Sequence, residues 1–365
     1  MTSVIDADLD RQALILLCAP TSIGGGSAPS FGPAAWHNFQ QVIVQRQLSP
    51  GQLLGMSETA LTADLDLTDD QAQRVSRLMA RGGPVAIEIE RLASRGIWIS
   101  VLGDETYPPR LAATLGALAP PLLFGVGRAS IAAQDGLAIV GSRDADEEAI
   151  EYTESVAALA VKGGLTIISG AARGVDAAAM TSALEHGGSV VGVVADGLEK
   201  RIREPQIRMW LADERLCLIT PYGSNSGFSV GAAMGRNKLI YGMSAFALVV
   251  AATPGKGGTW AGATEALKSR WSTVLVRRGW TDGSAADQLV ELGALAFPDG
   301  SHDDFSAAGL EKFIAQQPSA SDEAPQMRAD GLPVQATMFG EPEALVASTG
   351  GGAKARSGKS AKTRT

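Results

Sequence analysis

Six short apolar runs in the second half of the chain constrain the fold more than any other feature. They lie at residues 137–140, 165–168, 189–194, 216–220, 246–251 and 273–276. The spacers between them are long enough for helices, and this alternation is typical of βαβ units. A βαβ crossover is right-handed and makes its strands parallel, so the carboxyl ends of the strands share one edge of the sheet. We therefore expect an α/β protein whose connecting loops gather on one rim.

The two ends of the chain differ from this repeat in composition. Residues 1–95 alternate apolar helical patterns with turn clusters, and Thr68 with Gln71 forms a capping box, which predicts a small helical domain. Residues 314–365 are rich in Ser, Ala, Gly and Pro and finish on basic residues without an acid. This composition predicts a disordered basic tail.

Between these parts we expect a connecting segment and a core. The connecting segment is residues 96–136, with strand-like runs at 97–102 and 121–125. The core is residues 137–313, in which the last predicted strand ends at residue 276 and a further stretch completes the α/β domain.

Composition excludes several classes of function. Asp plus Glu number 39 against 31 Lys plus Arg, a net charge of -8, so any phosphate-binding surface must be local. Cys18 and Cys217 stand alone among apolar neighbours and three histidines are scattered, which argues against a metal centre. The apolar run 13–19 is too short for a signal peptide, follows acidic residues and ends at Pro20. No run is long enough to cross a membrane, so we expect a cytoplasmic protein.

Two loops after predicted strands carry groups suited to phosphate. The first holds Gly141, Ser142 and Arg143, and the second holds Gly170 and Arg173. Glycine lets the backbone approach an anion, serine offers a hydroxyl, and arginine offers a guanidinium beside a helix N-terminus. An ordinary tight turn with an exposed arginine explains the first loop equally well. Two such loops on one rim favour a binding site.

Further basic residues follow the next two strands. Lys200 and Arg201 belong to a charge run that by itself is typical of a solvated face, and on this rim it could extend a groove. Arg236, Asn237 and Lys238 stand at a predicted helix start. Positive side chains there oppose the helix dipole and cost stability unless an anion binds. This arrangement favours a functional role.

The fifth loop, residues 253–259, leads into a helix predicted at 260–270. It offers backbone amides, the ammonium group of Lys256, the flexible Gly257 and the hydroxyl of Thr259. Such groups cradle phosphates at helix N-termini. No G-x-G-x-x-G sequence follows the first strand, so the dinucleotide fingerprint is missing.

Taken together, four ordered motifs resemble the DNA-processing protein A (DprA, also called Smf) family. The resemblance covers roughly residues 10–280 and rests on Tyr-Pro at 107–108 with Pro-Leu-Leu-Phe at 121–124, Ala-Ile-Val-Gly-Ser-Arg at 138–143, Ser-Gly-Ala-Ala-Arg-Gly-Val-Asp at 169–176 and Gly-Arg-Asn-Lys-Leu-Ile at 235–240. It implies an extended Rossmann-like domain with a doubly wound, mostly parallel sheet, preceded by a small helical, SAM-like domain.

The resemblance also implies a function. Members of the family bind single-stranded DNA without cutting it, form homodimers, and load the RecA recombinase in natural transformation or recombination. The implied protein is not an enzyme and needs no cofactor. The family's DNA groove corresponds here to Ser142, Arg143, Arg236, Asn237 and Lys238, and Gly170 and Arg173 belong to its second motif.

This sequence departs from the family pattern in four places. The Tyr-Pro pair that the family has after its Gly-Leu-Asp segment is replaced by Ile-Arg-Glu-Pro at residues 202–205, and the family's Ser-Gly-Ser helix start is Gly-Gly-Thr at residues 257–259. Residues 233–234 are Ala-Met where the family has Phe-Pro, and residues 305–365 show no winged helix. These departures indicate a divergent member, whose biological setting could be transformation, repair or defence.

A second resemblance suggests an enzyme. Residues 254–259 look like the phosphate loop of lysine-decarboxylase-like (LOG) nucleoside-monophosphate phosphoribohydrolases, which need a glutamate three residues after the threonine. Gly262 occupies that place here, and Glu265 lies about one turn further along. Glycosidic hydrolysis needs a carboxylate near the anomeric carbon, so the displacement argues against activity. Binding of a mononucleotide remains an alternative.

Overall fold

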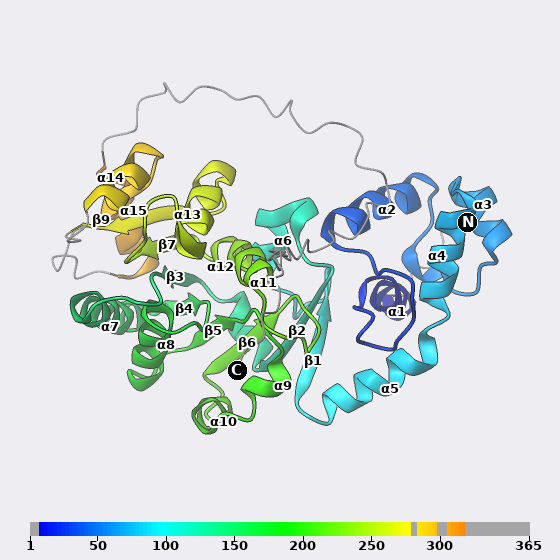
Figure 1. Ribbon diagram of the computed structural model, residues 1–365, viewed down its shortest axis with the longest axis horizontal. Coiled ribbons are helices and arrows are strands. Elements are labelled where there is room, and N and C mark those ends of the chain that lie inside the picture. Colours follow the sequence, from blue (N-terminus) through cyan, green and yellow to red (C-terminus); the bar gives the residue numbers. More distant parts are fainter. Residues whose placement is uncertain (1–6, 279–282, 298–304, 318–365) are drawn as a thin grey trace, which may run out of the picture.

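The computed structural model describes residues 7–278, 283–297 and 305–317 (Figure 1). Within these residues a nine-stranded sheet has the order β1-β2-β6-β5-β4-β3-β7-β8-β9. The strands are β1 (Ile97–Val101), β2 (Leu122–Gly127), β3 (Gly136–Val140), β4 (Thr166–Ser169), β5 (Val190–Val193), β6 (Leu216–Thr220), β7 (Phe246–Val249), β8 (Thr273–Arg277) and β9 (Leu295–Phe297).

The predicted α/β class is confirmed. Each of the six apolar runs forms a strand, β3 to β8, and every pairing among them is parallel. The strand-like runs at 97–102 and 121–125 do more than connect, because β1 and β2 extend the same sheet beyond β6 as antiparallel strands. The sheet is therefore mixed, with a parallel centre.

The strand order reverses between β3 and β7. The chain moves outward from β3 through β4 and β5 to β6, then returns to place β7 on the other side of β3 and continues to β8 and β9. Val140 pairs with Val249 at the carboxyl ends of these two central strands. In open α/β sheets such a reversal leaves a crevice where the flanking loops part in opposite directions.

The central strands are buried on both faces, which explains their nearly continuous apolar sequences. Leu137 and Ile139 of β3 belong to one apolar cluster, with residues of α7 and α8, whereas Ala138 and Val140 belong to a second, with residues of α6, α12 and α13. Figure 1 shows these helix groups on opposite sides of the sheet. The helices are α6 (Pro109–Leu115), α7 (Glu147–Lys162), α8 (Val175–Glu185), α9 (Leu198–Arg201), α10 (Pro205–Ala212), α11 (Val230–Gly235), α12 (Asn237–Met243) and α13 (Gly257–Ser269).

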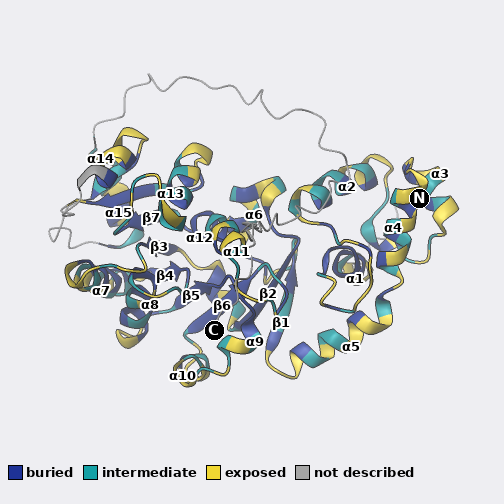
Figure 2. Ribbon diagram, in the orientation of Figure 1, coloured by how far each residue is buried: buried dark blue, intermediate teal, exposed yellow. Residues whose placement is uncertain are grey.

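The described N-terminal residues form five α-helices before β1. Thr68 and Gln71 make the expected capping box at the start of α4, and both side chains accept hydrogen bonds from the other residue's backbone N–H. Apolar residues of these helices share a cluster with β1, so they pack against that end of the sheet (Figures 1 and 2). The helices are α1 (Ala7–Cys18), α2 (Pro33–Gln45), α3 (Glu58–Leu65), α4 (Asp69–Met79) and α5 (Gly82–Ala93).

The last described residues complete the other end of the sheet. Helix α14 (Gly283–Glu291) leads to β9, which pairs in parallel with β8, and α15 (Ala307–Ala315) follows. Of the basic tail predicted at 314–365, residues 318–365 lie outside the described residues.

Candidate functional site

A cavity opens at the crevice between the ends of β3 and β7. It holds about 500 Å³ and collects loops that lie far apart in the sequence. Its lining includes the loop after β3, the segment that joins α11 to α12, and the start of α13. The polar residues of the lining are Ser142, Arg143, Asp176, Arg236, Asn237, Tyr241, Thr253, Lys256 and Thr259.

A second, smaller cavity continues along the same edge. It holds about 220 Å³ and lies over the loops after β4 and β5. Both cavities are lined by Arg143, Ala172, Phe228 and Arg236, so they adjoin each other. We call the residues that line the two cavities the rim groove.

The loop after β3 is held close to α8. A Cβ at Gly141 would lie 2.5 Å from Val175, so only glycine fits there. The Ser142 hydroxyl accepts a hydrogen bond from the backbone N–H of Asp144, 3.1 Å away. Arg143 is exposed, and its guanidinium lies 5.5 Å from the centre of the Phe228 ring. This loop places one cation and one aromatic face side by side at the groove.

The loop after β4 packs against Arg236. A Cβ at Gly170 would lie 1.6 Å from Nη1 of Arg236, which gives this glycine a packing role. Arg173 is 77 % exposed at its side chain and forms an ion pair of 3.3 Å with Asp144. An exposed pair of this kind contributes little stability, so Arg173 is available to an anion.

Arg236 is a buried cation of the rim groove. It is 5 % exposed, and its Nη1 donates to the carbonyl oxygen of Val193 at 2.9 Å. Its Nη2 lies 3.9 Å from a carboxylate oxygen of Asp176. Burial lowers the pKa of Arg236 and raises that of Asp176, and the charge of each partner opposes these shifts. The basic helix start therefore already has an internal counter-charge.

Two hydrogen bonds join the loops across the crevice. Thr259 Oγ1 donates to the carbonyl oxygen of Gly141 at 2.9 Å, and Asn237 Nδ2 donates to that of Gly258 at 2.9 Å. These bonds fix the start of α13 against the β3 loop and against α12. Lys256 and Gly257 remain exposed at the N-terminus of α13.

All but two of the predicted site residues line the rim groove. Arg201 lines it and pairs with Asp196 at 3.1 Å. The exceptions are Lys200, which is exposed on α9, and Lys238, which is half-buried on α12. The residues that line it are Gly141, Ser142, Arg143, Gly170, Arg173, Arg201, Arg236, Asn237, Lys256, Gly257 and Thr259.

Apolar side chains of the rim groove were not among the predicted site residues. Phe228, Val230 and Met234 are 54 %, 69 % and 46 % exposed, and all three line the larger cavity. The sequence does not indicate that these side chains are exposed, because an apolar residue in a loop can be either buried or exposed. Exposed apolar side chains gathered in one depression mark a binding surface.

The glutamate of the enzymatic alternative does not reach the cavity. Glu265 is exposed and is not part of its lining, and a Cβ at Gly262 would lie 3.0 Å from the Tyr241 ring. Asp176 is the carboxylate that the described residues contribute to the larger cavity, and it faces Arg236. The geometry therefore offers no carboxylate at the position that the LOG pattern requires.

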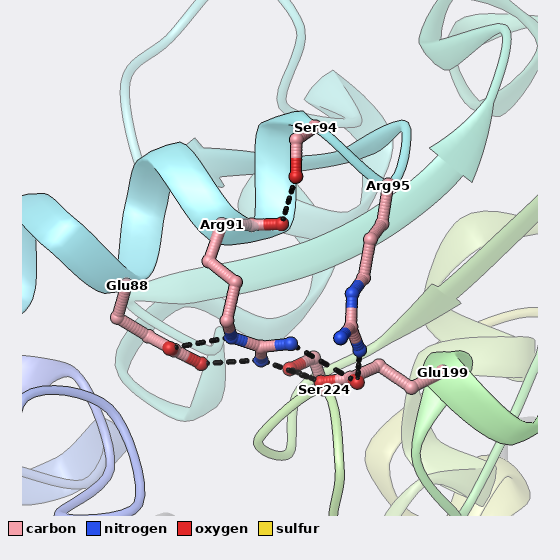
Figure 3. Close-up of polar contacts among 6 residues, drawn as sticks. All are labelled: Glu88, Arg91, Ser94, Arg95, Glu199 and Ser224. Atoms are coloured by element: carbon pink, nitrogen blue, oxygen red, sulfur yellow. Dashed lines mark hydrogen bonds and ion pairs between the residues drawn. The ribbon is translucent and has the colours of Figure 1, made fainter.

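A polar cluster ties the N-terminal helices to the edge of the rim groove (Figure 3). Arg91, on α5, binds Glu88 and Glu199, and Arg95 also pairs with Glu199 on α9. The hydroxyl of Ser224 donates to Glu199 at 3.3 Å. These hydrogen bonds and positive charges, Arg91 foremost, hold the pKa of Glu199 below its usual range. The cluster fixes α9, which carries Lys200 and Arg201.

Other kinds of site find no support in the described residues. They contain no group of three or more His, Cys, Asp or Glu side chains placed to hold a metal ion. Over the same residues, every helix is too short or too polar to span a bilayer. Cys18 and Cys217 are free thiols buried in apolar clusters, as expected for core residues.

Comparisons with known proteins agree with these features. Residues 98–303 match the family DNA recombination-mediator protein A. The chain is 34 % identical to Protein Smf of Synechocystis over 145 residues, which cover 38 % of this chain and 36 % of that protein. It is also 34 % identical to DNA processing protein DprA of Streptococcus pneumoniae over 96 residues, 26 % of this chain and 33 % of that protein. The matches thus span about a third of the length of these relatives.

The crystal structure of DNA processing protein A from Streptococcus pneumoniae aligns with a TM-score of 0.54. The alignment covers 79 % of this chain and 99 % of that chain at 22 % identity, which shows a shared fold. The family match covers more than half of the sequence and includes all the loops of the rim groove. The chain therefore belongs to the DNA recombination-mediator protein A family.

Proposed function

We propose that the rim groove binds single-stranded DNA. The observation that carries this proposal is the combination, in two adjoining cavities, of exposed cations, an exposed aromatic ring and a helix N-terminus. Arg143, Arg173 and Lys256 contact phosphates, and the amides at the start of α13 add donors. Phosphate contacts of this kind supply affinity without reading the sequence.

Phe228 gives the groove its preference for single strands. Its ring is 54 % exposed and carries Arg143 at its face. The faces of bases are available for stacking only when the strand is unpaired, and stacking on an aromatic ring tolerates any base. A duplex offers phosphates to the same cations but no base face to the ring.

The net charge of -8 does not oppose this function, because charge is segregated. Asp176 and Asp196 are the acidic residues that line the groove, and both are buried and lie within reach of an arginine, Arg236 and Arg201. The exposed cations therefore face solvent without an equal number of exposed acids in the groove.

The biological role follows from the family's description as a recombination mediator. We infer that the protein covers incoming single strands, is itself not an enzyme, and delivers the strands to a RecA recombinase in transformation or recombination, acting as a homodimer in the cytoplasm. Copurification of RecA with the strand-bound protein tests the recombinase partner. The mass of the protein in solution tests whether it is a homodimer.

Strand binding is tested by fluorescence anisotropy with a labelled oligo-dT and the matching duplex. We expect tighter binding to the single strand, and affinity that falls as salt rises from about 50 to 200 mM. Arg143→Ala should weaken binding and lower the salt slope by about 0.7, the loss of one phosphate contact. Phe228→Ala should weaken binding to the single strand while leaving the salt slope unchanged.

The matched control is Arg208→Ala, an exposed arginine on α10 that does not line the groove. It should bind as the wild type does. If Arg208→Ala and Arg143→Ala weaken DNA binding equally, the cations of the groove contribute no more to affinity than a surface arginine elsewhere, and the proposed site is wrong.

A further inference from the structure

The ring of Phe228 depends on its loop for its position in the rim groove. The ring is 54 % exposed, and it lies in the segment that joins β6 to α11. The next residue, Ser229, is fixed because its side chain caps α11. A side chain that becomes ordered only when a ligand binds costs part of the binding free energy, whereas a side chain held in place beforehand does not. The contacts that fix the loop before Phe228 therefore bear on strand affinity.

The start of α9 fixes the loop just before Phe228. The backbone N–H of Gly197 donates to the carbonyl oxygen of Ser226 at 2.7 Å, and the backbone N–H of Glu199 donates to that of Ser224 at 3.1 Å. A Cβ at Gly197 would lie 2.4 Å from the carbonyl oxygen of Ser224, so the two segments are in direct contact. Any movement of α9 would be transmitted to this loop.

Helix α9 needs an anchor, because a helix of four residues is not stable by itself. The anchor is the carboxylate of Glu199, whose side chain is 12 % exposed (Figure 3). Arg91 donates to its two oxygens at 2.7 and 3.2 Å, and Arg95 pairs with one of them. The Ser224 hydroxyl donates to the same carboxylate at 3.3 Å. One side chain thus joins α5, α9 and the loop that carries Phe228.

The N-terminal helices reach this loop at a second point. A Cβ at Gly223 would lie 2.7 Å from the hydroxyl oxygen of Ser22, which follows α1. The loop is therefore held between α9 on one side and the N-terminal part of the chain on the other.

We propose that Glu199 is a positioning residue for strand binding. The proposal rests on the proposed function, because it concerns the ring that stacks on a base. Glu199 lines neither cavity of the rim groove. It acts through Ser224 and the start of α9, which hold the loop so that Phe228 presents its face to a base. Through Arg91 and Arg95, the N-terminal helices contribute to the preference for single strands.

Glu199→Gln separates this role from an electrostatic effect, because the two predict opposite signs. The substitution removes a negative charge two residues from Arg201, which lines the groove, and by charge alone this would strengthen DNA binding. Loss of the positioning role weakens it. In fluorescence anisotropy we expect Glu199→Gln to weaken binding of oligo-dT about threefold. Affinity for the matching duplex should not fall, and the salt slope should stay the same because no phosphate contact is lost.

A double-mutant cycle assigns the effect to the ring. In a Phe228→Ala background, Glu199→Gln should no longer weaken binding of oligo-dT. Asp104→Asn is the matched control, because Asp104 pairs with Arg11 at 3.1 Å and so ties α1 to the turn after β1 and not to α9. This variant also loses an ion pair of the N-terminal helices, and it should bind oligo-dT as the wild type does.

Hydrogen exchange of the DNA-free protein tests the link to the loop without relying on strand binding. In Glu199→Gln we expect faster exchange in peptides that cover residues 222–229. Exchange in β3, β4 and β5 should be unchanged, which also shows that the variant is folded.

Two results would overturn the proposal. One is unchanged exchange of residues 222–229 in Glu199→Gln, and the other is a preference for oligo-dT over the duplex that Glu199→Gln leaves intact. Failure of the proposed function is a different result, because the wild type itself would then bind oligo-dT no better than the duplex.

Discussion

Replacing Gly170 with alanine should displace Arg236 from its buried position. A Cβ at position 170 would lie 1.6 Å from Nη1 and 2.3 Å from Cζ of that arginine. The backbone of Gly170 does not have a positive φ, so the main chain itself accepts alanine. The steric conflict is therefore confined to the guanidinium, which must leave the carbonyl of Val193 and the carboxylate of Asp176.

The expected cost has two parts. Overpacking a buried site costs about 1–3 kcal/mol. Leaving the Val193 carbonyl buried without its donor costs a further 1–3 kcal/mol or so. We expect Gly170→Ala to lower the free energy of unfolding by about 2–6 kcal/mol. It should also weaken strand binding, because the displaced side chain enters the rim groove.

A double-mutant cycle measured by urea unfolding isolates this conflict. In an Arg236→Ala background the new methyl group meets no guanidinium, so Gly170→Ala should cost less than about 0.5 kcal/mol there. The difference between the two backgrounds is the steric coupling of Gly170 to Arg236. An equal cost in both backgrounds would show that Gly170 and Arg236 are not in steric conflict.

Three other perturbations have definite outcomes. Glu199→Gln should reduce stability by about 1 kcal/mol at pH 7. Since the folded-state pKa of Glu199 lies below its ordinary value of 4.5, the difference in acid unfolding scans should begin to shrink below pH 4.5 and vanish only below the folded-state pKa. Arg81→Lys should cost about 2 kcal/mol in urea unfolding, because Arg81 is buried and its guanidinium donates to two backbone carbonyls at the end of α1, those of Leu16 and Ala19, in a geometry that an ammonium group does not match. Thr259→Val should cost about 1–2 kcal/mol by leaving the Gly141 carbonyl without its donor, whereas Thr259→Ser should retain most of the stability.

The parallel core could be predicted because its strands are buried on both faces. That environment requires uninterrupted apolar residues, so β3 to β8 are visible as runs such as 216–220. The antiparallel pairing of β1 and β2 could not be predicted in the same way. Their sequences indicate strands, but the direction and place of a strand depend on which edge is free, here that of β6.

The site could be predicted in its loops but not in the roles of single residues. Glycine and basic residues that follow parallel strands must lie at the same edge of the sheet. This rule placed Arg143 and Lys256 in the site correctly. Sequence cannot distinguish a buried arginine from an exposed one, so the packing of Arg236 against Gly170 was not anticipated. The exposure of Phe228 likewise depends on the path of a long loop and not on its neighbours in the sequence.

Hydrogen–deuterium exchange of the protein with and without oligo-dT shows where on the molecule the strand is bound. We expect slower exchange in the loops of the rim groove, in peptides that cover residues 141–144, 170–174, 228–237 and 253–259, and unchanged exchange in α10. Protection confined to α10 or to the N-terminal helices, with the rim loops unchanged, would contradict this expectation.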